Sequence, residues 1–320
     1  MKWRFDDIVT FLQVVEAGSI TAAAERLGMS KSVISKRISD LESAVDVELF
    51  RRSTRHVIPT DRGMAFYEKM RTLVHELEGA VEQVSMRDGE LRGRLRITAP
   101  MTSGTMHLGP VLAGFARQNP ELELAIDLDD KIIDLVGNGY DMAVRIGRLH
   151  DSSLVARKLC RSRRVVCCSP GYAREKGLPA TIDELSAHAC IDYANVHANR
   201  LWQFEPAELG GPPRSALTHS RLVANNGEAM RDMALAGLGL VILPLFLVAE
   251  QLRNGTLLNA LPGATPLPDS IYAIYPPSRH VSRRVRALID HLIVAFSETP
   301  PWELNAPPLD ASESAAAARN

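Results

Sequence analysis

The sequence predicts an all-α N-terminal domain, one long linker helix and a larger α/β domain. Three observations support this fold class. Apolar residues recur at helical spacing through residues 1–60. Residues 61 to about 86 carry apolar side chains spaced alternately four and three apart, the repeat of a helix that packs lengthwise on another. From Leu95 onward, short apolar strands alternate with helices, an order that favours a mostly parallel sheet covered on both faces.

The composition is that of a soluble globular chain. Its 320 residues are 46% hydrophobic and 23% charged, and the net charge is −1, so any affinity for a polyanion must rest on local charge. The first residues include acids where a signal peptide would need an apolar stretch. The longest uncharged run, Leu235–Ala249, is shorter than the about 20 residues that span a bilayer. We therefore expect a cytoplasmic protein with no membrane partner.

The four cysteines do not predict a metal site. Cys167 and Cys168 are adjacent in an apolar run, and neighbours on a strand point to opposite faces. Neither these two nor Cys160 and Cys190 form a Cys or Cys/His pair at zinc spacing, so we expect no metal and no cofactor. Small buried thiols in a reducing compartment are the favoured interpretation, and a redox-sensing pair is the alternative.

The first three predicted helices have the order of a helix-turn-helix. The first helix ends before Ser19, which can cap a second helix over Ile20–Leu27. Gly28 begins a tight turn to a third helix, which Ser30 caps and which runs to about Val45.

The third helix has one apolar and one polar face. Ile34, Ile38 and Leu41 lie within the apolar stripe, which predicts burial. The opposite face carries short hydroxyl side chains, which can approach base edges, and lysines, which can reach phosphates. The candidate DNA-binding residues of this helix are Ser30, Lys31, Ser32, Ser35 and Lys36. A solvated helix face is the alternative.

A basic turn follows the third helix. Two short apolar segments flank it between Val47 and Thr60, and this pattern predicts a β-hairpin wing. Its candidate phosphate contacts are Arg51, Arg52 and Arg55. Between residues 26 and 62, eight basic and five acidic side chains give a local charge of +3. The positive charge thus lies where a phosphate-binding surface would need it.

The linker helix begins near Asp61 and carries an apolar seam. The seam residues are Phe66, Met70, Leu73, Leu77, Ala80 and Val84. This repeat predicts that two copies of the helix pair in a dimer, and packing on the protein's own core is the alternative. Asp88 and Gly89 mark a boundary after the helix.

The rest of the chain is expected to form the α/β domain. Expected strands lie at 95–99, 122–127, 141–146, 164–168, 189–192, 240–243 and 271–275, and expected helices at 105–117, 132–136, 228–236 and 281–296. The tail at 299–320 is rich in Pro, Ala and Ser, and we expect it to be disordered.

Several of these segments resemble the LysR-type transcriptional regulators. Phe11–Leu27 is similar to the first two helices of that family, and Ser30–Glu42 to its recognition helix. Leu49–Arg52 and Thr60–Gly63 resemble its wing and the start of its linker, and Ala236–Pro244 resembles a stretch of its sensor domain. The resemblance covers about residues 5–297.

The resemblance implies a three-part architecture. A winged helix-turn-helix would occupy 1–60, a dimerisation helix 61–88, and a two-lobed domain similar to a type 2 periplasmic binding protein 92–297. Lobe one would hold 92–161 and 268–297, lobe two 162–267, and a small-molecule effector would bind between them. The implied partners are a double-stranded DNA operator, further copies of the chain in a homodimer or tetramer, and RNA polymerase if the protein is an activator.

The effector candidates lie at the ends of predicted strands, where ligands bind in open α/β sheets. The hydroxyls of Thr102 and Ser103, with nearby backbone amides, suit a small anion at a helix N-terminus. Further candidates are Arg145, Gly147, Tyr193, Asn225 and Asn226. Helix capping, a structural ion pair of Arg145 and plain loop roles are the alternatives. Many family members carry an acid where this chain has Asn226, so the resemblance by itself does not assign effector chemistry to that loop.

Other function classes fit the sequence less well. A secreted solute-binding protein would need a signal peptide and would have no use for residues 1–60. An enzyme would need a convergent set of acid, base or nucleophile, and none stands out. We therefore expect a non-enzymatic regulator switched by a small effector, with cysteine oxidation as the alternative switch.

Overall fold

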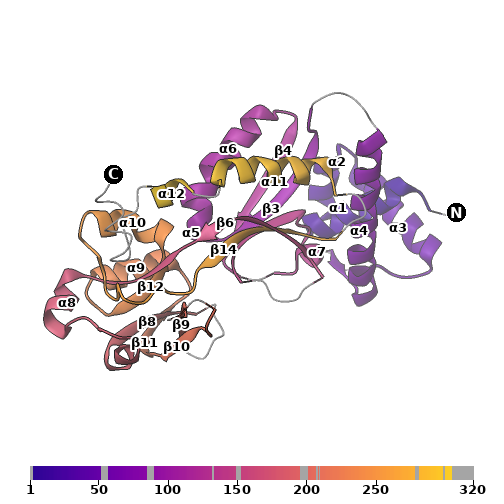
Figure 1. Cartoon of the computed structure of the whole chain (residues 1–320). Helices are drawn as coiled ribbons and strands as arrows, with labels where there is room; N and C mark the ends of the chain where they lie inside the picture. Colours follow the sequence, from indigo (N-terminus) through magenta and orange to yellow (C-terminus); the bar gives the residue numbers. More distant parts are fainter. Residues whose placement is uncertain are drawn as a thin grey trace. The chain divides into compact units, whose positions relative to one another are not determined.

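The computed structural model describes residues 3–51, 57–84, 90–131, 133–148, 153–194, 201–206, 208, 210–277, 281–297 and 300–304 (Figure 1). The chain divides into two compact units, and each is described by itself. The first unit comprises Met1–Gly89 with the short stretches Val136–Gly139 and Ser278–Arg283. The second comprises Glu90–Leu135, Tyr140–Pro277 and Arg284–Asn320.

The first unit opens with three helices, α1 (Phe5–Ala17), α2 (Ile20–Leu27) and α3 (Lys31–Val45). Ser19 and Ser30 cap α2 and α3 with their hydroxyl groups, as the sequence predicts. The helices pack around a core that includes Phe11, Ile34 and Leu41. The order and the caps confirm the predicted helix-turn-helix.

A short hairpin and a long helix complete the first unit. Strands β1 (Phe50–Arg51) and β2 (Ile58–Pro59) pair antiparallel, and α4 runs over Asp61–Val84. The Glu42 carboxylate of α3 accepts hydrogen bonds from the backbone N–H groups of Leu49 and Phe50, at 2.7 and 3.1 Å. At the start of α4, a Cβ on Gly63 would lie 2.0 Å from the Leu49 carbonyl oxygen, so this close approach requires glycine. The hairpin is thereby attached to both α3 and α4.

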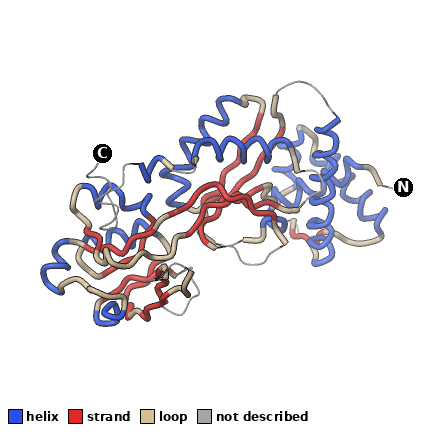
Figure 2. The backbone as a smooth tube through the Cα atoms, in the orientation of Figure 1, coloured by secondary structure: helices blue, strands red, loops and turns tan. Residues whose placement is uncertain are grey.

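The second unit contains two five-stranded sheets (Figure 2). Lobe one is built on the sheet of order β4-β3-β5-β14-β6, and lobe two on the sheet of order β11-β8-β12-β7-β13. The strands of lobe one are β3 (Gly93–Ala99), β4 (Leu122–Leu128), β5 (Met142–Gly147), β6 (Val155–Ser162) and β14 (Asp269–Tyr275). Those of lobe two are β7 (Arg164–Cys168), β8 (Ala189–Tyr193), β11 (His219–Ala224), β12 (Leu240–Pro244) and β13 (Leu258–Asn259). A separate antiparallel pair is formed by β9 (Leu201–Phe204) and β10 (Arg214–Leu217).

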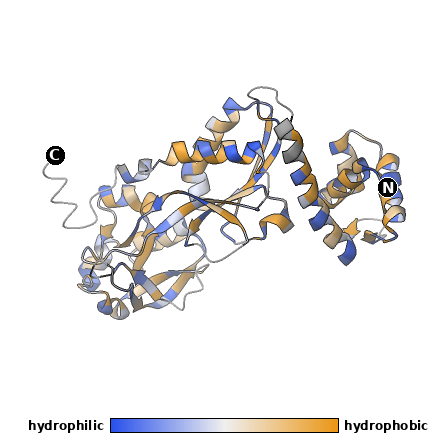
Figure 3. Cartoon of the chain, turned by 45° about the vertical axis from the view of Figure 1, so that its right-hand side comes forward, coloured by the Kyte–Doolittle hydropathy of each residue, from blue (hydrophilic) through white to orange (hydrophobic). Residues whose placement is uncertain are grey.

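The remaining helices complete the chain. They are α5 (Met101–Ser103), a π-helix (Gly104–Leu108), α6 (Gly109–Gln118), α7 (Leu135–Asn138), α8 (Pro170–Lys176), a 3-10 helix (Asp183–Ala187), α9 (Gly227–Leu235), α10 (Leu245–Arg253), α11 (Arg283–Phe296) and α12 (Pro301–Leu304). In Figure 3, helices around the sheets carry both hydrophobic and hydrophilic residues, as expected for helices that cover a sheet with one face.

Both sheets are mixed, so the prediction of a mostly parallel sheet was wrong. In lobe one, β3 is parallel to β4 and β5, whereas β14 is antiparallel to β5 and β6. In lobe two, β8 is parallel to β11 and β12, whereas β7 is antiparallel to β12 and β13. The period of a strand does not specify its direction, which is set by the neighbour that it pairs with.

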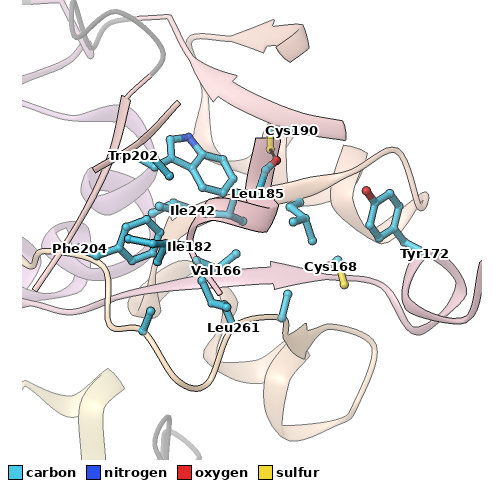
Figure 4. Close-up of a cluster of buried hydrophobic side chains, with 14 residues drawn as sticks. Val166, Cys168, Tyr172, Ile182, Leu185, Cys190, Trp202, Phe204, Ile242 and Leu261 are labelled. Carbon is cyan, nitrogen blue, oxygen red and sulfur yellow. Dashed lines mark hydrogen bonds between the residues drawn. The ribbon is translucent and has the colours of Figure 1, made fainter. Parts of the chain in front are cut away.

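The chain crosses between the lobes twice. It leaves lobe one at the end of β6 and enters β7 after a single residue, Arg163, and it returns between β13 and β14. A hydrophobic core cluster in lobe two includes Val166, Trp202 and Phe204 (Figure 4).

The segment after residue 299 differs in part from the expectation of disorder. Residues 301–304 form α12, and Trp302 is buried at 8% exposure. The expectation rested on the average composition of the segment, and an average does not reveal that one large aromatic side chain can pack on a folded domain. Residues 305–320 lie outside the described part of the chain.

Candidate functional site

The exposed face of α3 carries the residues predicted to contact DNA. Lys31, Ser32, Ser35 and Lys36 are exposed, while Ile34, Ile38 and Leu41 on the other face are buried. The Ser30 hydroxyl accepts a hydrogen bond from the Val33 N–H at 3.4 Å and lies 2.9 Å from the Ser32 hydroxyl. The helix therefore presents two lysines and a row of hydroxyls on its exposed surface.

Arg37 has a positioning role that the sequence pattern did not indicate. Its guanidinium donates a hydrogen bond to the Thr10 hydroxyl at 3.1 Å and lies 3.6 Å from the Asp6 carboxylate. The Thr10 side chain is buried between α1 and α3. This basic residue thus attaches α3 to α1 and fixes the orientation of the exposed face.

The predicted wing is described only in part. Arg51 is exposed at the end of β1. The candidates Arg52 and Arg55 lie outside the described residues.

The predicted seam on α4 is divided between two environments. Phe66 and Met70 pack against the core of the first unit, and the Phe66 ring centroid lies 5.4 Å from that of Phe11. Leu73 and Leu77 are exposed at 45% and 47%. Val81, which the predicted spacing did not include, is exposed at 55%. The side chains of Ala80 and Val84 lie outside the described part.

Thr102 and Ser103 lie in α5, directly after β3. Both side chains are buried, with 8% exposure each. Among the described residues, the Thr102 hydroxyl is buried without a hydrogen-bond partner. A buried hydroxyl without a partner costs free energy, so this position favours a ligand that supplies one. The following turn is a π-helix, a rare element that often occurs at functional sites.

The amide at the start of α5 is already engaged. The Met101 N–H donates a hydrogen bond to the Asp130 carboxylate at 3.0 Å. Burial raises the pKa of Asp130, and the bond from Met101 opposes this shift. The first of the amides expected to bind an anion therefore has an acidic partner within the chain.

Arg145 is held by the protein itself. Its guanidinium donates hydrogen bonds to the carbonyl oxygens of Val144 and Lys131, both at 3.2 Å, and to the Thr98 hydroxyl at 3.4 Å. Burial lowers the pKa of Arg145, and the nearby Asp129 and Asp130 carboxylates oppose this shift. These contacts favour a structural role for Arg145, in which its guanidinium binds backbone carbonyl groups and lies near two carboxylates. At Gly147, no heavy atom of the described residues lies within 4 Å of the position that a Cβ would take.

In lobe two, the fold brings two candidates together. Tyr193 at the end of β8 pairs in register with Ala224 at the end of β11, so Tyr193 and the exposed Asn225 lie at the same edge of the sheet. Asn226 instead caps α9, because its side-chain oxygen accepts the Ala229 N–H at 3.0 Å.

The sequence pattern missed Asp192, which precedes Tyr193. Its carboxylate accepts a hydrogen bond from Trp202 Nε1 at 2.9 Å and also binds the hydroxyls of Thr218 and Ser220. These partners lie far from Asp192 along the chain, so the spacing of the residues around Asp192 did not indicate them. In the part of the chain that the structure describes, no group of three or more His, Cys, Asp or Glu residues could hold a metal ion. Over the same residues, no helix has the length and hydropathy needed to cross a membrane.

Two family models match the chain. Residues 5–64 match the bacterial regulatory helix-turn-helix protein model of the lysR family, and residues 88–296 match the LysR substrate binding domain. The HTH-type transcriptional regulator PtxR of Pseudomonas aeruginosa is 39% identical over 291 residues, covering 90% of this chain and 92% of the relative. DmlR of Escherichia coli, also an HTH-type transcriptional regulator, is 31% identical over 297 residues, covering 92% and 95%.

Solved structures resemble most of the chain. CrgA, a LysR-type transcriptional regulator from Neisseria meningitidis, has a TM-score of 0.56 at 30% identity and covers 92% of this chain and 99% of its own. The full-length virulence activator AphB of Vibrio cholerae has a TM-score of 0.55 at 26% identity, covering 91% and 99%. A full-length OxyR variant from Pseudomonas aeruginosa, at 15% identity and a TM-score of 0.70, shows likeness of fold alone.

Proposed function

Because the chain belongs to the LysR family of bacterial transcriptional regulators, we propose that α3 reads the operator and that a small effector bound between the two lobes controls operator binding or activity. The relatives that it matches are transcriptional regulators, and its two family domains are a DNA-binding and an effector-binding domain.

The observation that carries the DNA-binding proposal is the exposed polar face of α3. A helix that reads the major groove needs polar side chains that hydrogen-bond base edges and cationic side chains that reach the phosphates. Ser32, Ser35 and Lys36 meet this requirement and are exposed. The opposite face is buried, so the helix has one orientation in which to present them.

The first experiment compares operator binding of Lys36→Ala and Ser35→Ala with the wild type. If the side chain contacts a base edge, its removal should weaken operator binding by about 1–3 kcal/mol and relax the sequence specificity at one position of the operator. The operator is first selected from genomic fragments by the wild-type protein, and affinities are then measured at several salt concentrations.

Lys176→Ala is the matched control, since Lys176 is an exposed lysine of α8. It should bind like the wild type. A non-specific duplex serves as a second probe, because loss of a phosphate contact would weaken both duplexes alike. Unchanged operator affinity in both α3 variants would exclude this face as the reading surface.

The observation that carries the effector proposal is the buried hydroxyl of Thr102, which has no hydrogen-bond partner in the described part of the chain. Helix α5, which holds Thr102, contacts α10 of lobe two, so a ligand bound at α5 can also reach the second lobe. Candidate contacts from lobe two are Tyr193 and Asn225 at the edge of its sheet. We propose an anionic effector that uses the hydroxyls and the amides beyond Met101, whose own N–H is bound to Asp130.

The second experiment uses matched neutral and anionic metabolites in a thermal-shift screen, because a ligand of the folded state raises stability by mass action. Calorimetric titration of the best compound then compares wild type, Thr102→Val and Thr105→Val. Thr102→Val should weaken binding by about 1–3 kcal/mol. The Thr105 hydroxyl is engaged with the Met101 carbonyl at 3.0 Å, and its variant is the matched control. Equal affinity of Thr102→Val and wild type would place the effector elsewhere.

A further inference from the structure

Helix α12 places two consecutive side chains at the junction of the lobes. Trp302 is buried at 8% exposure, and the Glu303 side chain is exposed at 9%. Figure 1 shows α12 beside α10 of lobe two, and the two helices are in contact.

The Trp302 ring contacts aromatic rings from both sides of the junction. Its centroid lies 4.5 Å from that of His107 in the π-helix of lobe one and 5.9 Å from that of Phe246 in α10. It also lies 5.6 Å from Phe296, at the end of α11. His107 and Phe246 contact each other directly, with 5.4 Å between centroids and 3.4 Å between His107 Nε2 and the Phe246 carbonyl oxygen. Trp302 therefore packs over a contact between the lobes.

Glu303 binds the residue at which the chain passes from one lobe to the other. Its carboxylate accepts hydrogen bonds from the backbone N–H of Arg163, at 3.3 Å, and from the Arg163 guanidinium. The Arg163 carbonyl in turn accepts the N–H of Leu245, the first residue of α10, at 2.8 Å. A charge-assisted pair with both partners largely buried holds its geometry better than an exposed one.

These contacts oppose relative movement of the lobes. In a hinge motion, a few connecting residues undergo most of the change in backbone angles. Arg163 is one of the points where the two lobes are connected. Rotation there would separate the His107 and Phe246 rings, expose Trp302 and strain the bonds to Glu303. The indole N–H of Trp302 has no partner among the described residues, so the restraint depends on ring packing rather than on that donor.

We propose that Trp302 and Glu303 form a C-terminal clasp, which restrains movement of the two lobes about Arg163. The clasp does not use the effector candidates of α5, since none of the contacts described above involves Thr102 or Ser103. Its release would allow the lobes to rearrange without disturbing either sheet.

Amide hydrogen exchange of the full-length protein tests the clasp, because exchange reports local opening segment by segment. Trp302→Ala and Glu303→Gln should each raise exchange at least tenfold in Gly104–Leu108 and at the start of α10, where Leu245 donates to Arg163. Exchange in the central strands β3 and β12 should stay as in the wild type. Trp302→Phe keeps a packing ring and should exchange like the wild type.

The matched control for Glu303→Gln is Glu123→Gln, which removes an exposed ion pair with Arg94 within lobe one. It should leave the junction segments unchanged. The proposal is overturned if Trp302→Ala leaves both junction segments as protected as in the wild type. It is also overturned if β3 and β12 lose protection by the same factor as the junction, because Trp302 would then be an ordinary core residue.

Discussion

At the scale of single residues, burial sets the chemistry of the four cysteines. All four are buried. Burial raises the pKa of Cys160 and of Cys190 to about 12 and that of Cys168 to about 11, and it also raises the pKa of Cys167. The thiolate is the reactive form, so these shifts weigh against the alternative of a switch by cysteine oxidation.

We predict that the native thiols react slowly with a disulfide reagent at pH 8 and react rapidly once the chain is unfolded in guanidinium. Since the folded-state pKa values exceed the ordinary value of 9.0, ionisation of the thiols should leave the free energy of unfolding unchanged below pH 9 and should lower it as the pH rises above 9. Spectrophotometric titration of thiols measures the first effect and chemical unfolding at several pH values the second. Fast reaction of a native thiol, with operator binding that depends on reductant, would favour the redox alternative.

At the scale of elements, α4 combines two functions along one helix. Its first turns complete the core of the first unit through Phe66 and Met70. Further along, Leu73 and Leu77 are exposed on one side of the helix. An apolar stripe of this kind favours a second helix as its partner, and we propose that this helix is α4 of another copy of the chain.

The double variant Leu73→Asp, Leu77→Asp should therefore lose the dimer, because four carboxylates would face each other in an apolar seam. Sedimentation velocity measures the assembly state. Ala65→Asp with Thr72→Asp is the matched control, since these positions lie away from the stripe on the same helix. If the Leu73 and Leu77 variant still pairs through α4, the stripe has another role.

At the scale of the whole molecule, a LysR-type regulator combines DNA binding, effector binding and self-association in one chain. A symmetric dimer carries two copies of α3, so the DNA that it binds should share its two-fold symmetry. Larger assemblies, such as a tetramer, would add further half-sites. If the protein activates transcription, RNA polymerase is the partner that we propose for the bound form.

We predict an imperfect inverted repeat whose half-sites lie about one helical turn, or a multiple of it, apart. Hydroxyl-radical footprinting of the selected operator should show two protected regions on the same face of the duplex. Moving one half-site by about half a turn should abolish tight binding, while moving it by a full turn should restore part of it. Protection of a single half-site by the intact dimer would contradict the symmetric arrangement.

The sequence by itself determined the helices of the first unit and much of the secondary structure of the second. Helix boundaries at Ser19, Gly28 and Ser30 follow from interactions over three or four residues, which the sequence displays directly. The buried and exposed faces of α3 follow from the helical period in the same way. The candidates Thr102 and Ser103 were found because ligands bind where strands end.

Only the tertiary structure decided what those candidates contact. Among the described residues the Thr102 hydroxyl has no hydrogen-bond partner, Arg145 binds backbone carbonyl groups and Asn226 caps α9. The tertiary structure also made both sheets mixed and brought Glu303 to Arg163, which lies 140 residues away in the sequence. Local periodicity reflects neighbours within a turn or a strand, whereas these contacts depend on how distant segments pack, and no residue spacing encodes that.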